Sequence, residues 1–129
     1  MDRLILNPES VPKPMGPYSQ GIMTSSTNIV FISGQVAEDE NGQLIGKGDA
    51  EQQARRAFQN LASVLKKAGG DLENIVKLTV ILTNRDYYPS VTKVRKELFS
   101  KSFPTATSFI VSGLAKQEWL VEIEAIAVL

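Results

Sequence analysis

Apolar residues recur along the chain at two spacings, which separate predicted helices from predicted strands. After Asp49 they follow intervals of three and four residues, typical of a helix with one buried face. Asp49 is the predicted N-cap, with Gln52 three residues later, and Gly69 and Gly70 end the helix. The apolar stripe consists of Ala54, Ala57, Phe58, Leu61, Val64, Leu65 and Ala68.

A second helix is predicted to start near Asp86 and to end before Pro104. Pro89 falls in its first turn, where a proline is tolerated because the N–H it lacks has no partner there. The apolar residues at helical spacing in this segment are Val91, Val94, Leu98 and Phe99. This helix is therefore also amphipathic.

Six segments rich in β-branched residues predict strands. With the helices they give the order β-β-β-α-β-α-β-β, which is not a regular βαβ alternation. We therefore expect a single α+β domain over residues 1–129, with two helices on one face of a mixed six-stranded sheet. The predicted strands are 3–6, 18–24, 28–36, 74–82, 105–111 and 119–128.

Several of these strands are apolar on both faces. Ile29 and Phe31 alternate with Val30 and Ile32, so each face of the segment carries large apolar side chains. Two helices can cover only one face of a sheet. The other face needs a partner, and in a chain of 129 residues the simplest partner is another copy. The pattern predicts a homo-oligomer.

Composition narrows the chemistry that the chain can support. It contains no cysteine and no histidine, so catalysis must rely on carboxylates, hydroxyls, amines or the backbone. Fourteen basic and fourteen acidic residues balance, which gives no support to nucleic-acid binding. No apolar run approaches the length of a membrane span. The N-terminus lacks the long apolar stretch of a secretory signal and reaches Pro8 early, so a cytoplasmic protein is the expectation, without a thiolate or histidine metal site.

Three short blocks carry a resemblance to a known family: GPYSQG at 16–21, ISGQ at 32–35 and VEIEAIAV at 121–128. The helix 52–69 and the strand 75–80 add to it, so the similarity covers nearly the whole chain. In order and spacing these blocks resemble the signatures of the Rid (YjgF) family.

The resemblance implies a chorismate-mutase-like fold and a homotrimer with clefts between adjacent subunits that bind a small molecule. It also implies hydrolysis of reactive enamine and imine intermediates to a ketone and ammonia, without a cofactor. The family name "endoribonuclease L-PSP" suggests a ribonuclease or translation inhibitor instead. However, this chain has neither a basic stripe nor a histidine pair.

Carried over residue by residue, the resemblance assigns catalytic roles to Tyr18 and Glu122, with Glu122 orienting or activating water. The implied substrate-binding positions are Ser33, Gly34, Thr92, Ala106 and Ser108. Three of them depart from the family pattern. Ala106 stands where the family has an arginine that grips a carboxylate, Thr92 where an asparagine is frequent, and Ser108 where a cysteine is frequent.

The loss of the arginine leaves three hypotheses open. The chain is a deaminase whose substrate lacks a carboxylate or is held by other groups, a non-catalytic trimer that binds or regulates through a small molecule, or a ribonuclease. A substitute cation from Arg95 belongs to the first, because Thr92 and Arg95 lie one helical turn apart. Otherwise we expect surface positions for Arg55, Arg56, Arg85 and Arg95.

Overall fold

The structure is a computed structural model that describes residues 2–129. The order of its strands and long helices is the predicted β-β-β-α-β-α-β-β. Short 3-10 turns precede β4 and α2. The elements are β1 (Arg3–Leu6), β2 (Gly21–Thr24), β3 (Ile29–Gln35), α1 (Ala50–Lys67), β4 (Ile75–Leu82), α2 (Tyr88–Leu98), β5 (Thr105–Ile110) and β6 (Val121–Val128).

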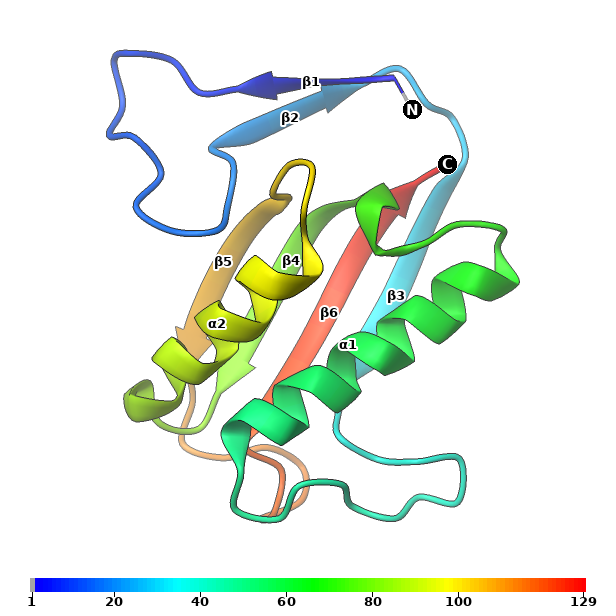
Figure 1. The fold of residues 1–129 in the computed structure, drawn as a ribbon, viewed down its shortest axis with the longest axis vertical. Helices are drawn as coiled ribbons and strands as arrows, with labels where there is room; N and C mark the ends of the chain where they lie inside the picture. The colour runs from blue at the N-terminus through cyan, green and yellow to red at the C-terminus, as the bar shows by residue number, and fades with distance from the viewer. Residues whose placement is uncertain (1) are drawn as a thin grey trace.

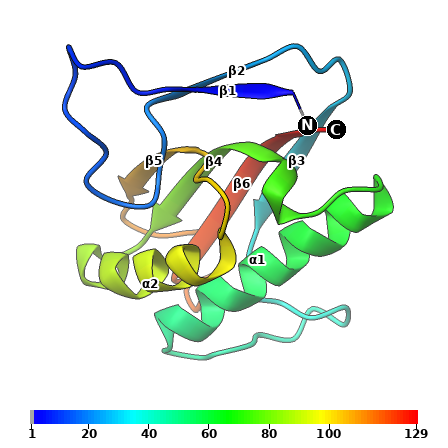
Figure 2. The same ribbon diagram turned by 45° about the horizontal axis from the view of Figure 1, so that its top comes forward.

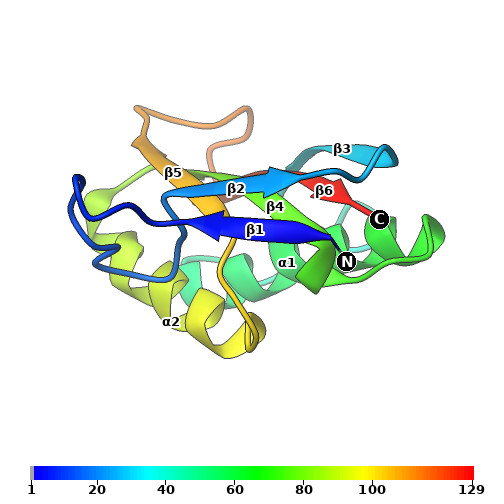
Figure 3. The ribbon, with the colours of Figure 1, turned by 90° about the horizontal axis from the view of Figure 1, so that it is seen from above.

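Four strands form the main sheet, in the order β3-β6-β4-β5. β6 runs antiparallel to both of its neighbours, whereas β4 and β5 are parallel. Helices α1 and α2 cover the same face of this sheet, as Figure 1 and Figure 3 show from two directions. The prediction of a mixed sheet with two helices on one face is confirmed.

The prediction that all six strands share one sheet is wrong. β1 and β2 form a separate two-stranded sheet that crosses one end of the main sheet (Figure 2). The strand pattern identified both segments as extended, but alternation of side chains does not say which strand pairs with which. The outer edge of β3 therefore carries no strand partner in residues 2–129.

The core lies between the helices and the main sheet, and α1 supplies much of it. Asp49 accepts a hydrogen bond from the N–H of Gln52 at 3.0 Å, as the cap predicted. The helix stops where Gly69 adopts a positive φ of 90°, a conformation that suits glycine. Phe58 of α1 meets Phe99 edge to face, with ring centroids 5.9 Å apart. The two helices are thereby locked together over the sheet.

The other face of the sheet is open. Phe31 is 75% exposed and Phe109 is 53% exposed, whereas Ile32 beside Phe31 is buried. The strands are thus apolar on both faces, and only one face is covered within the chain. The open face of the sheet therefore still needs a partner, as the sequence pattern indicates.

Candidate functional site

The residues singled out in the sequence fall into two groups on opposite faces of the main sheet. The first group lies at the β5 edge. Ala106 and Ser108 of β5 pair with Leu78 and Val80 of β4, both fully buried under the helices. Parallel partners share a face, so Ala106 and Ser108 point toward the helix layer, where α2 lies (Figure 1).

Tyr18 joins this group through its backbone. The next residue, Ser19, donates its N–H to the carbonyl of Pro104 at 3.0 Å, and it forms an isolated parallel bridge with Thr105. The segment that contains Tyr18 therefore lies along the start of β5, close to Ala106. Tyr18 itself is half-buried. The prediction that 18–24 is one strand is too long at its start, because β2 begins only at Gly21.

Thr92 belongs to the same region. It lies on α2, and its hydroxyl oxygen is buried without a hydrogen-bond partner in the described chain. A buried hydroxyl without a partner is uncommon, because burial removes its hydrogen bonds to water. The Thr92 hydroxyl can therefore still donate or accept a hydrogen bond, at a position that the family resemblance places in the cleft.

Arg95, one turn further along α2, was expected at the surface, and that expectation is wrong. The side chain is only 2% exposed. Its Nη2 donates to the carbonyl of Pro17 at 2.8 Å, while Nε has no partner within residues 2–129. Burial lowers the pKa of Arg95, and the nearby Tyr88 opposes that shift. No carboxylate of the described chain forms an ion pair with it.

A signal for this burial is present in the sequence. Arg95 follows Val91 by four residues and Val94 by one, so it lies on the apolar stripe of α2, and both valines are buried. The charge of Arg95 predicts exposure, whereas its position on the helix predicts burial. An arginine can place its methylene groups among apolar neighbours, so helical position was the better guide.

The second group lies on the open face, on β3 and β6. Val121 and Ile123 are fully buried toward the helices, so Glu122 between them points to the open face. Glu122 is half-buried, and its carboxylate forms no hydrogen bond or ion pair with the described residues. Glu122 is therefore available to a bound molecule from that side.

Gly34 lies directly beneath this carboxylate. β3 contains one extra residue between Ile32 and Gln35 relative to β6, which is a β-bulge. A Cβ at position 34 would collide with the carboxylate of Glu122. Glycine is required here because the Glu122 carboxylate lies so close to the backbone of residue 34. The backbone conformation does not require it, because φ of Gly34 is not positive. Ser33 is exposed beside it.

One protomer does not bring the two groups together. β4 separates β5 from β6 in the sheet, and the first group faces the helices whereas Glu122 faces away from them. A cleft that uses Tyr18, Thr92 and Ala106 together with Glu122 needs residues from two copies. The inter-subunit cleft remains a prediction.

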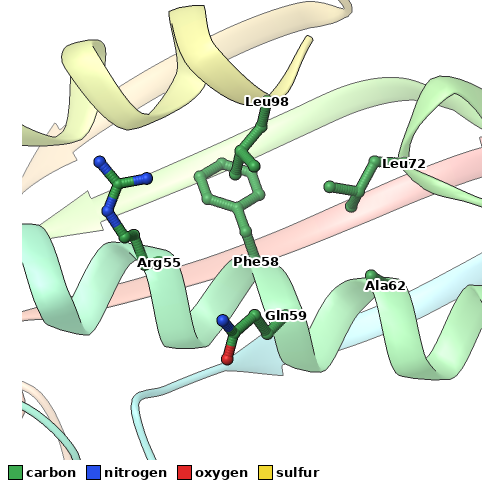
Figure 4. A pocket seen from close by; sticks show the side chains of 6 residues that line it. All are labelled: Arg55, Phe58, Gln59, Ala62, Leu72 and Leu98. Carbon is green, nitrogen blue, oxygen red and sulfur yellow. The ribbon is translucent and has the colours of Figure 1, made fainter.

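The pocket drawn in Figure 4 lies elsewhere, between α1 and α2, and has a volume of about 260 Å³. Phe58 points from α1 toward Leu98 of α2 across it. Arg55 at its rim is paired with Glu97 at 2.7 Å and with Glu51 at 3.4 Å. The pocket contains none of the predicted site residues. Its lining is Arg55, Phe58, Gln59, Ala62, Leu72 and Leu98.

Comparison with known proteins places this geometry in a family. The sequence model of the family described as Endoribonuclease L-PSP matches residues 8–129. YyfB from Yersinia pestis, a protein of the conserved Rid protein family, superposes with a TM-score of 0.91 over 100% of both chains at 32% identity. The chain belongs to the Rid family. No helix in residues 2–129 of this Rid protein is long and apolar enough to cross a membrane.

The chain is also similar to a bovine deaminase and to a solved structure from E. coli. The 2-iminobutanoate/2-iminopropanoate deaminase of Bos taurus is 41% identical over 127 residues, which is 98% of this chain and 90% of the bovine protein. The crystal structure of E. coli TdcF with bound serine superposes with a TM-score of 0.72 at 32% identity, over 97% of this chain and 98% of TdcF.

The two solved structures do not resemble this chain equally. YyfB and TdcF have the same 32% identity to it and almost the same coverage, yet their TM-scores differ by 0.19.

Proposed function

We propose that this Rid protein is a hydrolytic deaminase of reactive enamine and imine metabolites that works without a cofactor. The observation that carries the proposal is the open-face pair of Glu122 and Gly34, in which a half-buried carboxylate without an internal hydrogen bond lies over bare backbone. The 41% identity to the bovine 2-iminobutanoate/2-iminopropanoate deaminase, over nearly the whole chain, supports the reaction class.

The reaction needs a group that takes a proton from water and groups that position the substrate. The carboxylate of Glu122 accepts a proton from a water molecule as the water oxygen bonds to the imine carbon. Glu122 returns that proton to the imine nitrogen, which gives the neutral carbinolamine. The hydroxyl proton of the carbinolamine then passes to the nitrogen as the C–N bond breaks, so that ammonia leaves and the carbonyl forms. One water is consumed for each ammonia released. Tyr18, Ser33 and Ser108 position the substrate, and no redox step or cofactor is needed.

Substrate binding in this chain differs at position 106. Ala106 offers no charge to a substrate carboxylate, so a carboxylate-bearing imine must be held by another group, or the substrate lacks the carboxylate. The cation best placed to replace it is Arg95, which reaches the same side of the sheet from α2. It is buried, and its Nε has no hydrogen-bond partner in residues 2–129. A guanidinium pairs well with a carboxylate because its N–H groups match the two oxygens.

The deciding experiment measures release of ammonia and keto acid from 2-iminobutanoate generated in situ by a threonine dehydratase. We expect wild-type protein to accelerate release beyond the spontaneous rate. Glu122→Gln keeps the size of the side chain but cannot accept the proton, so we expect a loss of about 10²–10⁴-fold in kcat. Wild-type activity that survives Glu122→Gln unchanged would rule out this role.

The Ala106→Arg variant separates the remaining candidates. If wild-type protein is inactive on 2-iminobutanoate and Ala106→Arg gains activity, the deaminase scaffold is intact and the natural ligand is not an imine anchored by its carboxylate. If neither protein is active, the chain is a small-molecule-binding trimer without catalysis. The unpartnered hydroxyl of Thr92 and the small Ala106 favour this second candidate, because they leave an uncharged, polar lining.

A further inference from the structure

The N-terminal arm, residues 2–24, has two features of a segment that exchanges between copies. β1 and β2 pair only with each other, from Arg3 with Thr24 to Leu6 with Gly21. The second edge of β2 and the outer edge of β3 both lack a strand partner in the described chain. A two-stranded hairpin alone is marginally stable in water, and a free strand edge is a template for pairing.

The link between β2 and β3 is only Ser25–Asn28. Four residues are a common length for a hairpin loop, so the chain is long enough for β2 to fold back onto its own β3. In the structure it does not. The arm is held at the opposite edge of the sheet, where Ser19 binds Pro104 and Arg95 binds Pro17. Figure 2 shows the arm extended away from β3.

Further contacts tie the arm to the β4 and β5 end of its own protomer. Arg3 of β1 donates from Nη1 to the carbonyl of Ile75 at 3.0 Å, and from Nη2 to the hydroxyl of Ser102 at 2.9 Å. These bonds fix the position of the arm while the edge of β2 stays open. The only β3 edge that an arm in this position can meet belongs to another molecule.

The side chains on the two free edges suit such pairing. If β2 folded back onto its own β3 through the four-residue link, Ile22 would lie beside Phe31 and Met23 beside Val30. We expect the same pairs when β2 comes from another copy. Neither strand carries a charge, so no repulsion opposes their contact. The large exposed apolar residues on these two strands are Met23 (58%), Ile29 (52%) and Phe31 (75%).

Reciprocal exchange buries this surface in every copy. The contact takes in three large exposed apolar side chains and the backbone of four residues on each strand, which are otherwise left to solvent.

We propose that the arms of this protein are exchanged between copies, so that β2 of each chain completes the sheet of a second copy along β3. The 17–19 segment of the arm stays on β5 of its own chain. The inference does not depend on the proposed deaminase activity. It makes each main sheet six-stranded, with two of the six strands supplied by a neighbour.

The absence of cysteine allows a direct test. In the Ile22→Cys/Phe31→Cys variant, oxidation of the purified protein links β2 to β3 where they pair. We expect covalent oligomers on a non-reducing denaturing gel. In a second experiment, ¹⁴N-labelled and ¹⁵N-labelled proteins are mixed, allowed to exchange subunits and then oxidised. We expect disulfide-linked peptides in which one half carries ¹⁴N and the other ¹⁵N. Disulfides confined to single chains would overturn the proposal, and so would a complete lack of disulfides.

A second cysteine pair guards against a variant that fails to fold. Met23→Cys/Val30→Cys probes the same register from the other face of the two strands and leaves Phe31 in place. Glu9→Cys/Phe31→Cys is the matched control, because Glu9 lies in the arm but outside both of its strands. We expect at least tenfold less interchain disulfide in the control. Equal yields in control and test pairs would show random collision and would also overturn the proposal.

Discussion

At the scale of single residues, Arg95 is the position whose burial most needs a cause. A buried charge without a partner costs several kcal/mol, and one hydrogen bond to the carbonyl of Pro17 offsets only part of that cost. Two roles would justify the arrangement. Arg95 either holds the Pro17–Tyr18 backbone in place or binds a carboxylate that arrives with the substrate.

Substrates with and without a carboxylate distinguish these roles. If Arg95 binds the carboxylate, Arg95→Met should lower kcat/KM for 2-iminobutanoate by about tenfold to a hundredfold, the equivalent of one charge-assisted hydrogen bond. The same variant should process an imine of equal length without a carboxylate as wild type does. A purely structural role predicts equal losses for both. Arg85→Met, an exposed arginine before α2, is the control and should leave both rates unchanged.

Gly34 offers a second prediction at this scale. In Gly34→Ala the new methyl group has no room beside Glu122, so the carboxylate must move. We expect kcat for ammonia release to fall by at least tenfold, while the unfolding midpoint in urea changes little because the site faces the open side of the sheet. Gly113→Ala is the control, since nothing lies near its Cβ position and its φ is not positive. A fully active Gly34→Ala would contradict the proximity argument.

At the scale of elements, α1 is joined to its surroundings by one buried amide. Gln53 is fully buried. Its Nε2 donates to the carbonyls of Gly46 and Glu118, both at 3.1 Å, and its Oε1 accepts from the N–H of Leu120 at 2.9 Å. Gln53 thus connects the start of α1 to two loops, the one that precedes α1 and the one that precedes β6.

Gln53→Leu keeps the volume of the side chain and removes all three bonds. Backbone groups of Gly46, Glu118 and Leu120 would then lose their partners in a site that water reaches poorly. We expect a loss of about 3 kcal/mol in the free energy of unfolding, measured by urea denaturation. Gln52→Leu, at the exposed neighbouring position, should change stability by less than about 0.5 kcal/mol. Equal effects in the two variants would show that the bonds of Gln53 contribute nothing specific.

Local pattern predicted the elements well and their partners less well. The cap at Asp49, the stop at Gly69 and the strand β1 at Arg3–Leu6 lie where the sequence indicated, because each depends on residues close together in the chain. Pairing of β1 and β2 with the main sheet is decided by contacts across the molecule, and the strand pattern does not encode it. For the same reason the sequence did not show that Glu122 and Ala106 lie on opposite faces.

At the scale of the whole molecule, two features leave apolar surface without cover. The open face of the main sheet exposes Phe31 and Phe109, and the free edges of β2 and β3 expose backbone. Surface of this kind is rarely tolerated on a soluble monomer. The division of the candidate site between two faces adds a functional reason for assembly, since only a second copy can bring Tyr18 and Glu122 to one cleft.

The two-faced strands predict a homo-oligomer and the resemblance to the Rid family implies a trimer, which sedimentation equilibrium at micromolar concentration measures. Phe31→Glu places a charge on the open face without touching the core, so we expect the variant to sediment as a monomer with its helix content intact by circular dichroism. Val64→Glu introduces the same charge on the exposed side of α1, where Val64 is 39% exposed, and should remain trimeric. A monomeric wild-type protein would remove the basis for a shared cleft. A trimeric Phe31→Glu variant would show instead that the subunits meet through a different surface. Because Glu122 lies on the face that assembly covers, loss of the trimer should abolish ammonia release in the same samples.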